Sequence, residues 1–269
     1  MEPKKEQSVE EHHSRAINDF LSRYKTQDGF VAFLLAGSLA HGFAKEDSDV
    51  DIIIVATEEE YERRQRQNKL AFSFWDICKY PGGYIDCKVV SIKVLEEIAE
   101  KGSDPARYAF KDARVLYSRD TKIQDVLDRL TRYSRDKIND RQHRFACQLL
   151  AWKWYMSQAE GKKNQYLLHL ATQKVTLFSC RLILNDNAEL YPYHKWLLEE
   201  TKRTRRKPDG FLRLIDLILD KPSFDLAQKI TDCVFEFLGL IEKDIDWPNQ
   251  FMSDSEMNWA NHEAPIDDI

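Results

Sequence analysis

Hydrophobic residues recur along the first half of the chain with two different spacings. Between residues 8 and 24 they lie three or four positions apart, which predicts an amphipathic helix. Short apolar runs, most of them rich in β-branched residues, predict strands of a sheet. These runs lie at 30–36, 51–55, 84–91 and 114–117. Residues 58–69 are almost entirely polar, which fits a solvated helix or a long flap beside a site.

The second half of the chain follows the helical spacing almost throughout. Glycine and proline residues divide it into predicted helices, at 122–160, 164–185, 192–203, 209–220 and 223–244. A helical bundle is the natural architecture for such a series. We therefore expect an α/β (α+β) domain with a short mixed sheet at 1–120, followed by an all-α helical bundle domain at 121–269.

Composition narrows the class of protein. Of the 269 residues, 43% are hydrophobic and 32% are charged, as in a globular protein with a buried core. The net charge of −5 argues against a protein that coats nucleic acid through a general positive field. The five scattered cysteines predict reduced, mostly buried thiols. The polar first twenty residues lack the apolar core of a signal peptide, and no apolar run is long enough to span a membrane. We expect a cytoplasmic protein, with His12 and His13 exposed in its polar opening stretch.

The stretch between the first two predicted strands carries the candidate chemistry. Gly37 and Ser38 follow the first strand, where a glycine lets backbone N–H groups and a hydroxyl approach a phosphate. Asp49 and Asp51 stand two positions apart at the start of the second strand, so the pleat sends both carboxylates to one face. Two such carboxylates repel each other unless a cation lies between them, and oxygen ligands beside phosphates suit Mg²⁺.

A third acid, Asp86, stands among apolar residues of the strand at 84–91. A neighbouring strand would bring it alongside the first two acids, and three carboxylates can hold two ions about 4 Å apart. Lys88 shares the face of Asp86 by strand alternation, so it would meet either phosphate or the acids themselves.

A Gly-Ser turn, ten intervening residues, an Asp-Val-Asp triplet and an apolar strand together resemble the signature of the DNA polymerase β-like nucleotidyltransferase superfamily. The resemblance spans about residues 15–118. It implies transfer of a nucleoside monophosphate from a nucleoside triphosphate to a hydroxyl, with release of pyrophosphate. It also implies two Mg²⁺ ions, with ATP or another nucleoside triphosphate as co-substrate.

Residue by residue, the resemblance implies that Ser38 binds the β- and γ-phosphates and that Asp49 and Asp51 hold both metal ions. Asp86 would hold the catalytic ion, and either Asp86 or an acid of the helical domain would take the acceptor's proton. Gly37 and Ser48 are further candidates for nucleotide binding.

In the second half, aromatic residues surround His194 and Lys195. The segment looks like the proline–lysine–tryptophan helix start of small-molecule nucleotidyltransferases, which makes Lys195 a candidate phosphate contact; the alternative is a surface or packing role. The basic run 202–207 is either a solvated helix end or an attractor for phosphate, nucleic acid or an acidic partner.

Length and the helical second half favour an enzyme resembling the aminoglycoside and lincosamide nucleotidyltransferases, and hence a role in antibiotic resistance. We expect a small hydroxylated acceptor rather than nucleic acid, no membrane association, and a monomer or homodimer. The alternatives are a nucleotide or RNA nucleotidyltransferase, such as a cyclic-nucleotide synthase or a tailing enzyme, and an inactive antitoxin-like binding module.

Overall fold

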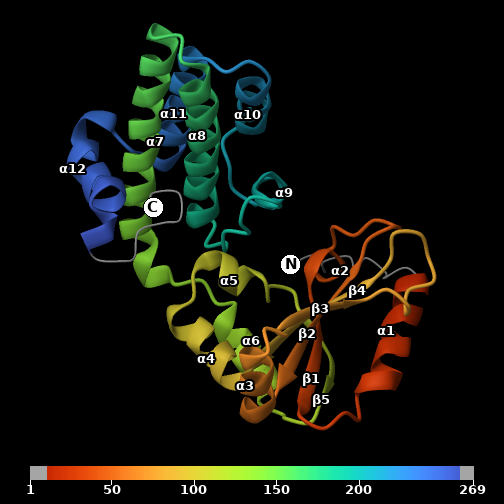
Figure 1. Cartoon of the computed structure of the whole chain (residues 1–269). Coiled ribbons are helices and arrows are strands. Elements are labelled where there is room, and N and C mark those ends of the chain that lie inside the picture. The colour runs from red at the N-terminus through yellow and green to blue at the C-terminus, as the bar shows by residue number, and fades with distance from the viewer. Residues whose placement is uncertain (1–10, 261–269) are drawn as a thin grey trace. The chain divides into compact units, whose positions relative to one another are not determined.

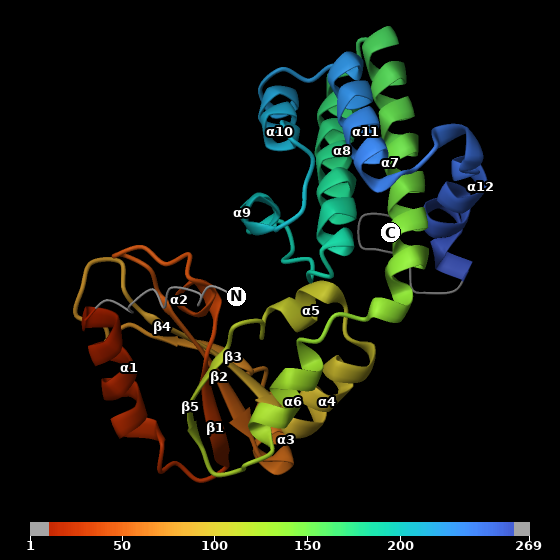
Figure 2. The same ribbon diagram turned by 180° about the vertical axis from the view of Figure 1, so that it is seen from behind.

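The computed structural model describes residues 11–260, and these form two compact units, of which the first ends at Arg132 and the second begins at Tyr133. The first unit is an α/β domain around a five-stranded sheet, and the second is helical, as the sequence predicts (Figures 1 and 2). No helix in the described part of the chain is long and apolar enough to cross a membrane.

The sheet is mixed, with strand order β3-β4-β2-β1-β5. Its strands are β1 (Phe30–Leu35), β2 (Val50–Ala56), β3 (Ala71–Phe74), β4 (Ile85–Ser91) and β5 (Arg114–Ser118). Strands β2 and β4 are parallel, and every other pair is antiparallel. The short edge strand β3 is absent from the sequence prediction, because four residues with half-exposed side chains give too little alternation to detect.

Helices cover both faces of this sheet. They are α1 (Glu11–Tyr24), α2 (Gly37–His41), α3 (Glu58–Arg66), α4 (Ile92–Lys101), α5 (Asp104–Tyr108) and α6 (Ile123–Leu130). Helix α1 packs Phe20 against Phe33 on one face of the sheet, whereas α4 and α6 cover the other face (Figure 1). Helices α4 and α5 were not predicted, although Ser91 and Ser103 cap them in the expected way.

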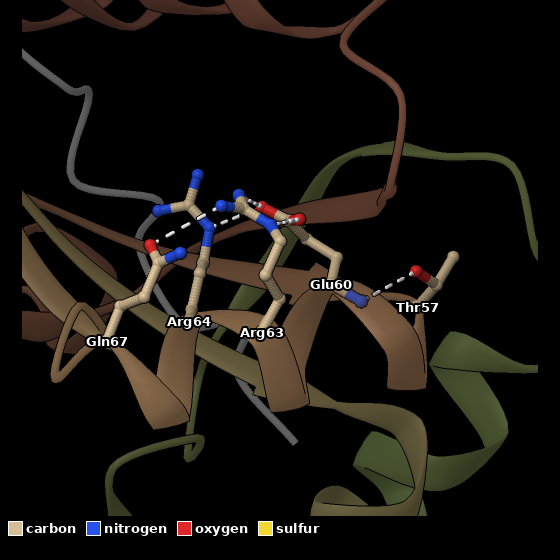
Figure 3. A network of polar contacts seen from close by, with 5 residues as sticks. All are labelled: Thr57, Glu60, Arg63, Arg64 and Gln67. Atoms are coloured by element: carbon tan, nitrogen blue, oxygen red, sulfur yellow. Dashed lines mark hydrogen bonds and ion pairs between the residues drawn. The ribbon is translucent and has the colours of Figure 1, made fainter.

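The polar stretch after β2 forms helix α3 rather than a flap. Figure 3 shows how it is held: the Thr57 hydroxyl accepts from the backbone N–H of Glu60 at 3.4 Å, and the Glu60 carboxylate binds Arg63 at 2.8 Å and Arg64 at 2.6 Å. The Arg64 guanidinium also lies 5.1 Å from the ring centre of Phe30. Side-chain pairing therefore fixes a helix that has no buried residue of its own.

The helix predicted over 122–160 is two helices, which corrects the sequence prediction. Helix α6 ends at Leu130, and α7 (Ile138–Gly161) begins after a turn of 3₁₀ helix, η1 (Arg135–Lys137). The buried Arg107 guanidinium donates to the carbonyl oxygens of Leu130 at 2.8 Å and Arg132 at 2.7 Å, so these carbonyls need no helical partner.

Because α6 packs with α4, the first compact unit includes α6 and extends to Arg132. The predicted domain division at residue 120 has no independent test and stays a prediction.

The second unit is a bundle in which α7 and α8 (Gln165–Asp186) pack along their length. Around them lie α9 (Leu197–Arg203), α10 (Phe211–Asp220), α11 (Phe224–Leu238), η2 (Glu242–Asp244), α12 (Trp247–Phe251), the π-helix η3 (Met252–Glu256) and η4 (Asn258–Ala260). The predicted helix at 223–244 ends early, because Gly239 takes the left-handed conformation at φ 67°. All five cysteines are free and four are buried, as predicted.

Candidate active site at one edge of the sheet

Five strand ends meet at one edge of the sheet, since β5 also begins there, with Arg114 opposite Leu35. In the antiparallel pair β1–β2, Leu35 lies opposite Ile52, so the end of β1 meets the start of β2. In the parallel pair β2–β4, both strands begin at this edge, and the antiparallel β3 ends there with Phe74 opposite Ile85. This arrangement makes neighbours of residues that are distant in sequence. They are the residues just after β1 and β3 and those at the starts of β2 and β4.

The register places two of the three predicted acids side by side. Asp51 lies directly opposite Asp86 in the parallel pair of strands β2 and β4, and partners in register point to the same face. Both carboxylates are partly buried. Sequence reasoning expected a neighbouring strand to bring Asp86 alongside Asp49 and Asp51, and the sheet brings it opposite Asp51.

Asp86 has two further polar neighbours on the sheet. The Ser73 hydroxyl of β3 donates to its Oδ1 at 3.1 Å, and Lys88 Nζ lies 3.9 Å from its Oδ2. The sequence predicted that Lys88 would meet either phosphate or the acids, and in the structure it lies beside Asp86. A lysine that is 65% exposed holds such a pair loosely.

Asp49, which precedes β2, accepts a hydrogen bond from the Tyr84 hydroxyl. This bond, together with desolvation and the negative charge of Asp49, raises the pKa of Tyr84 to about 12. The tyrosine therefore stays neutral and keeps its donor directed at the carboxylate through the physiological pH range. Tyr84 fixes the orientation of Asp49 across the sheet edge.

The Gly-Ser turn after β1 is packed against Asp51. Gly37 has φ +62°, and a Cβ built there would lie 1.7 Å from Asp51 Oδ2, so only glycine fits. The backbone N–H of Ala36 donates to the Asp51 carbonyl oxygen at 3.0 Å, which holds the turn to β2. Ser38 begins the first turn of α2 and is buried, and its Oγ has no hydrogen-bond partner among residues 11–260. A buried hydroxyl without a partner is an available group for a ligand.

Helix α1 supports the loop that carries Asp49. The backbone N–H of Lys45 donates to Ser48 Oγ at 2.8 Å, and the Ser48 carbonyl oxygen accepts from His13 Nε2 at 3.1 Å and from the Tyr80 hydroxyl at 2.8 Å. His13 is completely buried, so the prediction of an exposed histidine pair is wrong. The histidine supports the loop, and the Ser48 hydroxyl closes it.

The donor set fits a hard divalent cation, because three carboxylates and the hydroxyl of Ser38 offer oxygen ligands. In the part of the chain that the structure describes, however, no set of three or more His, Cys, Asp or Glu side chains is arranged so that it could hold a metal ion. Asp51 faces Asp86, whereas Asp49 is directed to Tyr84. The metal-binding roles of the three acids stay a prediction.

Lys195 lies in the second unit, in a segment that is not helical. Helix α9 begins only at Leu197, because Tyr193 has φ +65°, which breaks a helix. The prediction that the proline before Tyr193 starts a helix is therefore wrong. Lys195 is exposed, with Nζ 5.0 Å from the centre of the Trp196 ring. Its role as a phosphate contact stays a prediction.

Sequence reasoning missed three side chains at this edge: Ser73, Trp75 and Tyr84. Ser73 and Trp75 lie on or just after the undetected strand β3. Tyr84 stood in the predicted strand, and its even spacing from Asp86 was the signal that it shares the face of the acids.

Comparison with known proteins agrees with this geometry. The family model for the nucleotidyltransferase domain matches residues 14–109, a span that holds all three acids and the Gly-Ser turn. A solved structure of a nucleotidyltransferase-like protein from Exiguobacterium sibiricum 255-15 is similar at 12% identity and a TM-score of 0.42, covering 93% of this chain and 80% of that chain. That likeness is too weak to carry an argument. No curated protein matches the chain.

Proposed function

We propose that this chain transfers AMP from ATP to a hydroxyl of a small molecule. The premise is that residues 14–109 are a nucleotidyltransferase domain and that the chain is a nucleotidyltransferase. The reaction would depend on Mg²⁺, release pyrophosphate and take place in the cytoplasm. The observation that carries the proposal is the pairing of Asp51 with Asp86 beside the Gly37–Ser38 turn, because it puts acids and a phosphate-binding turn at one edge.

Each residue of this edge has a part in the proposed reaction. The turn at Gly37 and the buried Ser38 hydroxyl bind the β- and γ-phosphates, so the leaving pyrophosphate stays at the end of β1. The acceptor oxygen attacks the α-phosphorus, the bond to pyrophosphate breaks, and Asp86 takes the hydroxyl proton on a carboxylate oxygen.

Asp49, Asp51 and Asp86 would hold the magnesium ions, since carboxylates are the ligands that this ion prefers. When bound, the ions polarise the attacking hydroxyl and neutralise charge on the triphosphate. Tyr84 keeps the Asp49 carboxylate oriented until then.

The acceptor is proposed to be a hydroxylated small molecule of the aminoglycoside or lincosamide kind. The net charge of −5 and the acidic edge favour a cationic or neutral acceptor over a polyanion. The resemblance to antibiotic nucleotidyltransferases, with a helical unit after the catalytic unit, supports the same choice.

The experiment incubates the protein with Mg²⁺, each labelled nucleoside triphosphate in turn and a panel of hydroxylated antibiotics. We expect pyrophosphate release that depends on the acceptor, with a gain in acceptor mass equal to one nucleoside monophosphate. Linear or cyclic oligonucleotides formed without acceptor would replace this proposal with a nucleotide or RNA nucleotidyltransferase. No turnover with any nucleotide would favour an inactive binding module.

A further inference from the structure

One large aromatic side chain at the acidic edge is exposed to solvent. Trp75 directly follows β3 and is 70% exposed, and one face of its indole stacks on the Tyr84 ring, with ring centres 4.4 Å apart and planes at 19°. The other indole face has no ring contact among the described residues. An indole that is stacked on one side and open on the other is suited to binding a second flat ring.

This stack is built into the candidate site. Ser73 and Asp86 are register partners on one face of the sheet, and the residues two positions after Ser73 and two before Asp86 are Trp75 and Tyr84. The Tyr84 hydroxyl donates to Asp49, so the tyrosine that supports the indole also orients one of the acids.

The backbone on both sides of Trp75 is anchored, so its exposure is not the result of a loose loop. Phe74 packs on Tyr24 of α1 with ring centres 4.8 Å apart, and Asp76 accepts from Arg23 at 2.7 Å. The indole therefore stands at a fixed place.

The strand order shows which substrate would reach this indole. In an in-line displacement the attacking oxygen and the leaving group lie on opposite sides of the phosphorus. The turn proposed to hold the pyrophosphate follows β1, the acids begin β2 and β4, and Trp75 follows β3 at the far end of the series. The indole is therefore on the side from which the acceptor attacks.

We propose that Trp75, supported by Tyr84, is the stacking platform for a ring of the acceptor, and that the enzyme selects hydroxylated ring compounds over linear polyols. This inference rests on the proposed nucleotidyl transfer, and it specifies the acceptor class. Trp75 contacts the substrate, whereas Tyr84 is a positioning residue for both the indole and Asp49.

The first test measures binding without nucleotide or metal. Tryptophan fluorescence is followed while adenosine, methyl α-glucopyranoside or sorbitol is added to the full-length protein and to its Trp75→Phe variant. We expect methyl α-glucopyranoside to change the emission of the wild type, sorbitol to have no effect, and the ring-dependent change to disappear in the variant. A response to adenosine that depends on Trp75 would instead place the base of the nucleotide on the indole and overturn the assignment to the acceptor.

The second test measures turnover with the best acceptor found in the antibiotic panel. Trp75→Leu is expected to raise the KM of the acceptor roughly five- to hundredfold, the range that loss of one ring stack gives, with the KM of the nucleotide unchanged. Trp75→Phe should restore most of the loss. Trp259→Leu is the matched control, because Trp259 is also exposed, at 59%, and lies in the second unit.

The two proposals fail in different ways. If the wild type turns over but Trp75→Leu leaves the KM of the acceptor unchanged, the platform is wrong and nucleotidyl transfer stands. If methyl α-glucopyranoside does not change the fluorescence through Trp75, or if sorbitol acts equally, the acceptor platform is overturned as well. If no nucleotide is turned over, the transfer proposal fails, and the fluorescence titration still decides whether Trp75 binds a ring.

Discussion

The two units treat charged and polar groups in opposite ways. In the second unit the buried ammonium of Lys153 is paired with Glu242 at 2.8 Å. In the first unit two like charges, Asp51 and Asp86, lie opposite each other on adjacent strands. Opposite charges in contact stabilise a fold, whereas adjacent carboxylates oppose it unless a cation binds.

Most buried hydroxyl groups of the bundle have a partner, although the Thr176 hydroxyl of α8, like that of Ser38, has none within residues 11–260. In the bundle, Thr201 donates to the Leu197 carbonyl oxygen at 2.7 Å, and Thr231 donates to that of Ala227 at 2.8 Å. The buried Ser38 hydroxyl in the first unit has no such partner within residues 11–260. An unpartnered hydroxyl is available to a ligand, and that of Ser38 differs from that of Thr176 because Ser38 follows Gly37, which packs on Asp51.

The largest effect is expected from Asp51→Asn. The change removes a proposed metal ligand, and because a bound ion supplies several kcal/mol, turnover should fall by roughly a thousandfold or more. Thermal stability without metal should stay equal or rise, since one of two facing charges is gone. Asp49→Asn is expected to lower turnover as much as Asp51→Asn does. Activity near the wild-type level in either variant would remove the metal assignment.

The next largest effect is expected from Asp86→Asn, which separates metal binding from proton transfer. If Asp86 accepts the proton, the single-turnover rate should fall roughly 100- to 10,000-fold while nucleotide affinity is retained through Asp49 and Asp51. The measurement is nucleotide binding and single-turnover rate across pH. Equal losses in binding and rate, or a rate profile that rises with pH as in the wild type, would transfer the base to an acid of the helical unit.

Gly37→Ala tests the close packing of the turn on Asp51. Its Cβ would overlap Asp51 Oδ2, and displacement of a reacting group by about 1 Å costs roughly a hundredfold in rate. Gly210→Ala is the matched control, because φ is +73° there and nothing lies within 4 Å of the added Cβ. Both variants should lose about 1–2 kcal/mol of stability through the left-handed backbone, with a further loss in Gly37→Ala from the overlap with Asp51, but only Gly37→Ala should lose turnover. Equal turnover in the two variants would contradict the proposal that the turn at Gly37 and Ser38 binds the triphosphate.

Glu242→Gln tests the opposite charge arrangement in the bundle. The change leaves the Lys153 ammonium buried without its counter-charge and should lower the free energy of unfolding by roughly 1–3 kcal/mol. Chemical denaturation of the variant and the wild type measures this loss. A variant as stable as the wild type would show that the half-exposed glutamate contributes nothing, and the contrast between the units would rest on Asp51 and Asp86 alone.

The smallest effect is expected from Ser38→Ala. A neutral hydrogen bond to phosphate contributes roughly 0.5–1.5 kcal/mol, so the KM of the nucleotide should rise about tenfold or less, with little change in the KM of the acceptor. Steady-state kinetics with each substrate varied in turn provides the measurement. An effect on acceptor binding alone would place Ser38 outside the phosphate-binding turn. It would also reverse the proposal that the pyrophosphate lies at the end of β1 and the acceptor at the end of β3.

Much of the fold follows from local patterns. The strands at Phe30–Leu35 and Val50–Ala56 were predictable because each is a continuous apolar run, and the long helix α8 because Gly161 and Pro192 bound it. The break between α6 and α7 was not predictable, because it depends on the distant side chain of Arg107. The burial of His13 also depends on a partner 35 residues away, the carbonyl oxygen of Ser48.

By itself, the sequence determined the class of the protein, an α/β nucleotidyltransferase domain followed by helices, because the Gly-Ser turn, the acid pair and the strand spacing are local features. The tertiary structure decided which residues share the site. The strand register brings Asp86 opposite Asp51, and the short edge strand delivers Ser73 and Trp75 to the same edge. Register arises from contacts between distant strands, so periodicity along one strand does not specify its neighbour or what faces it.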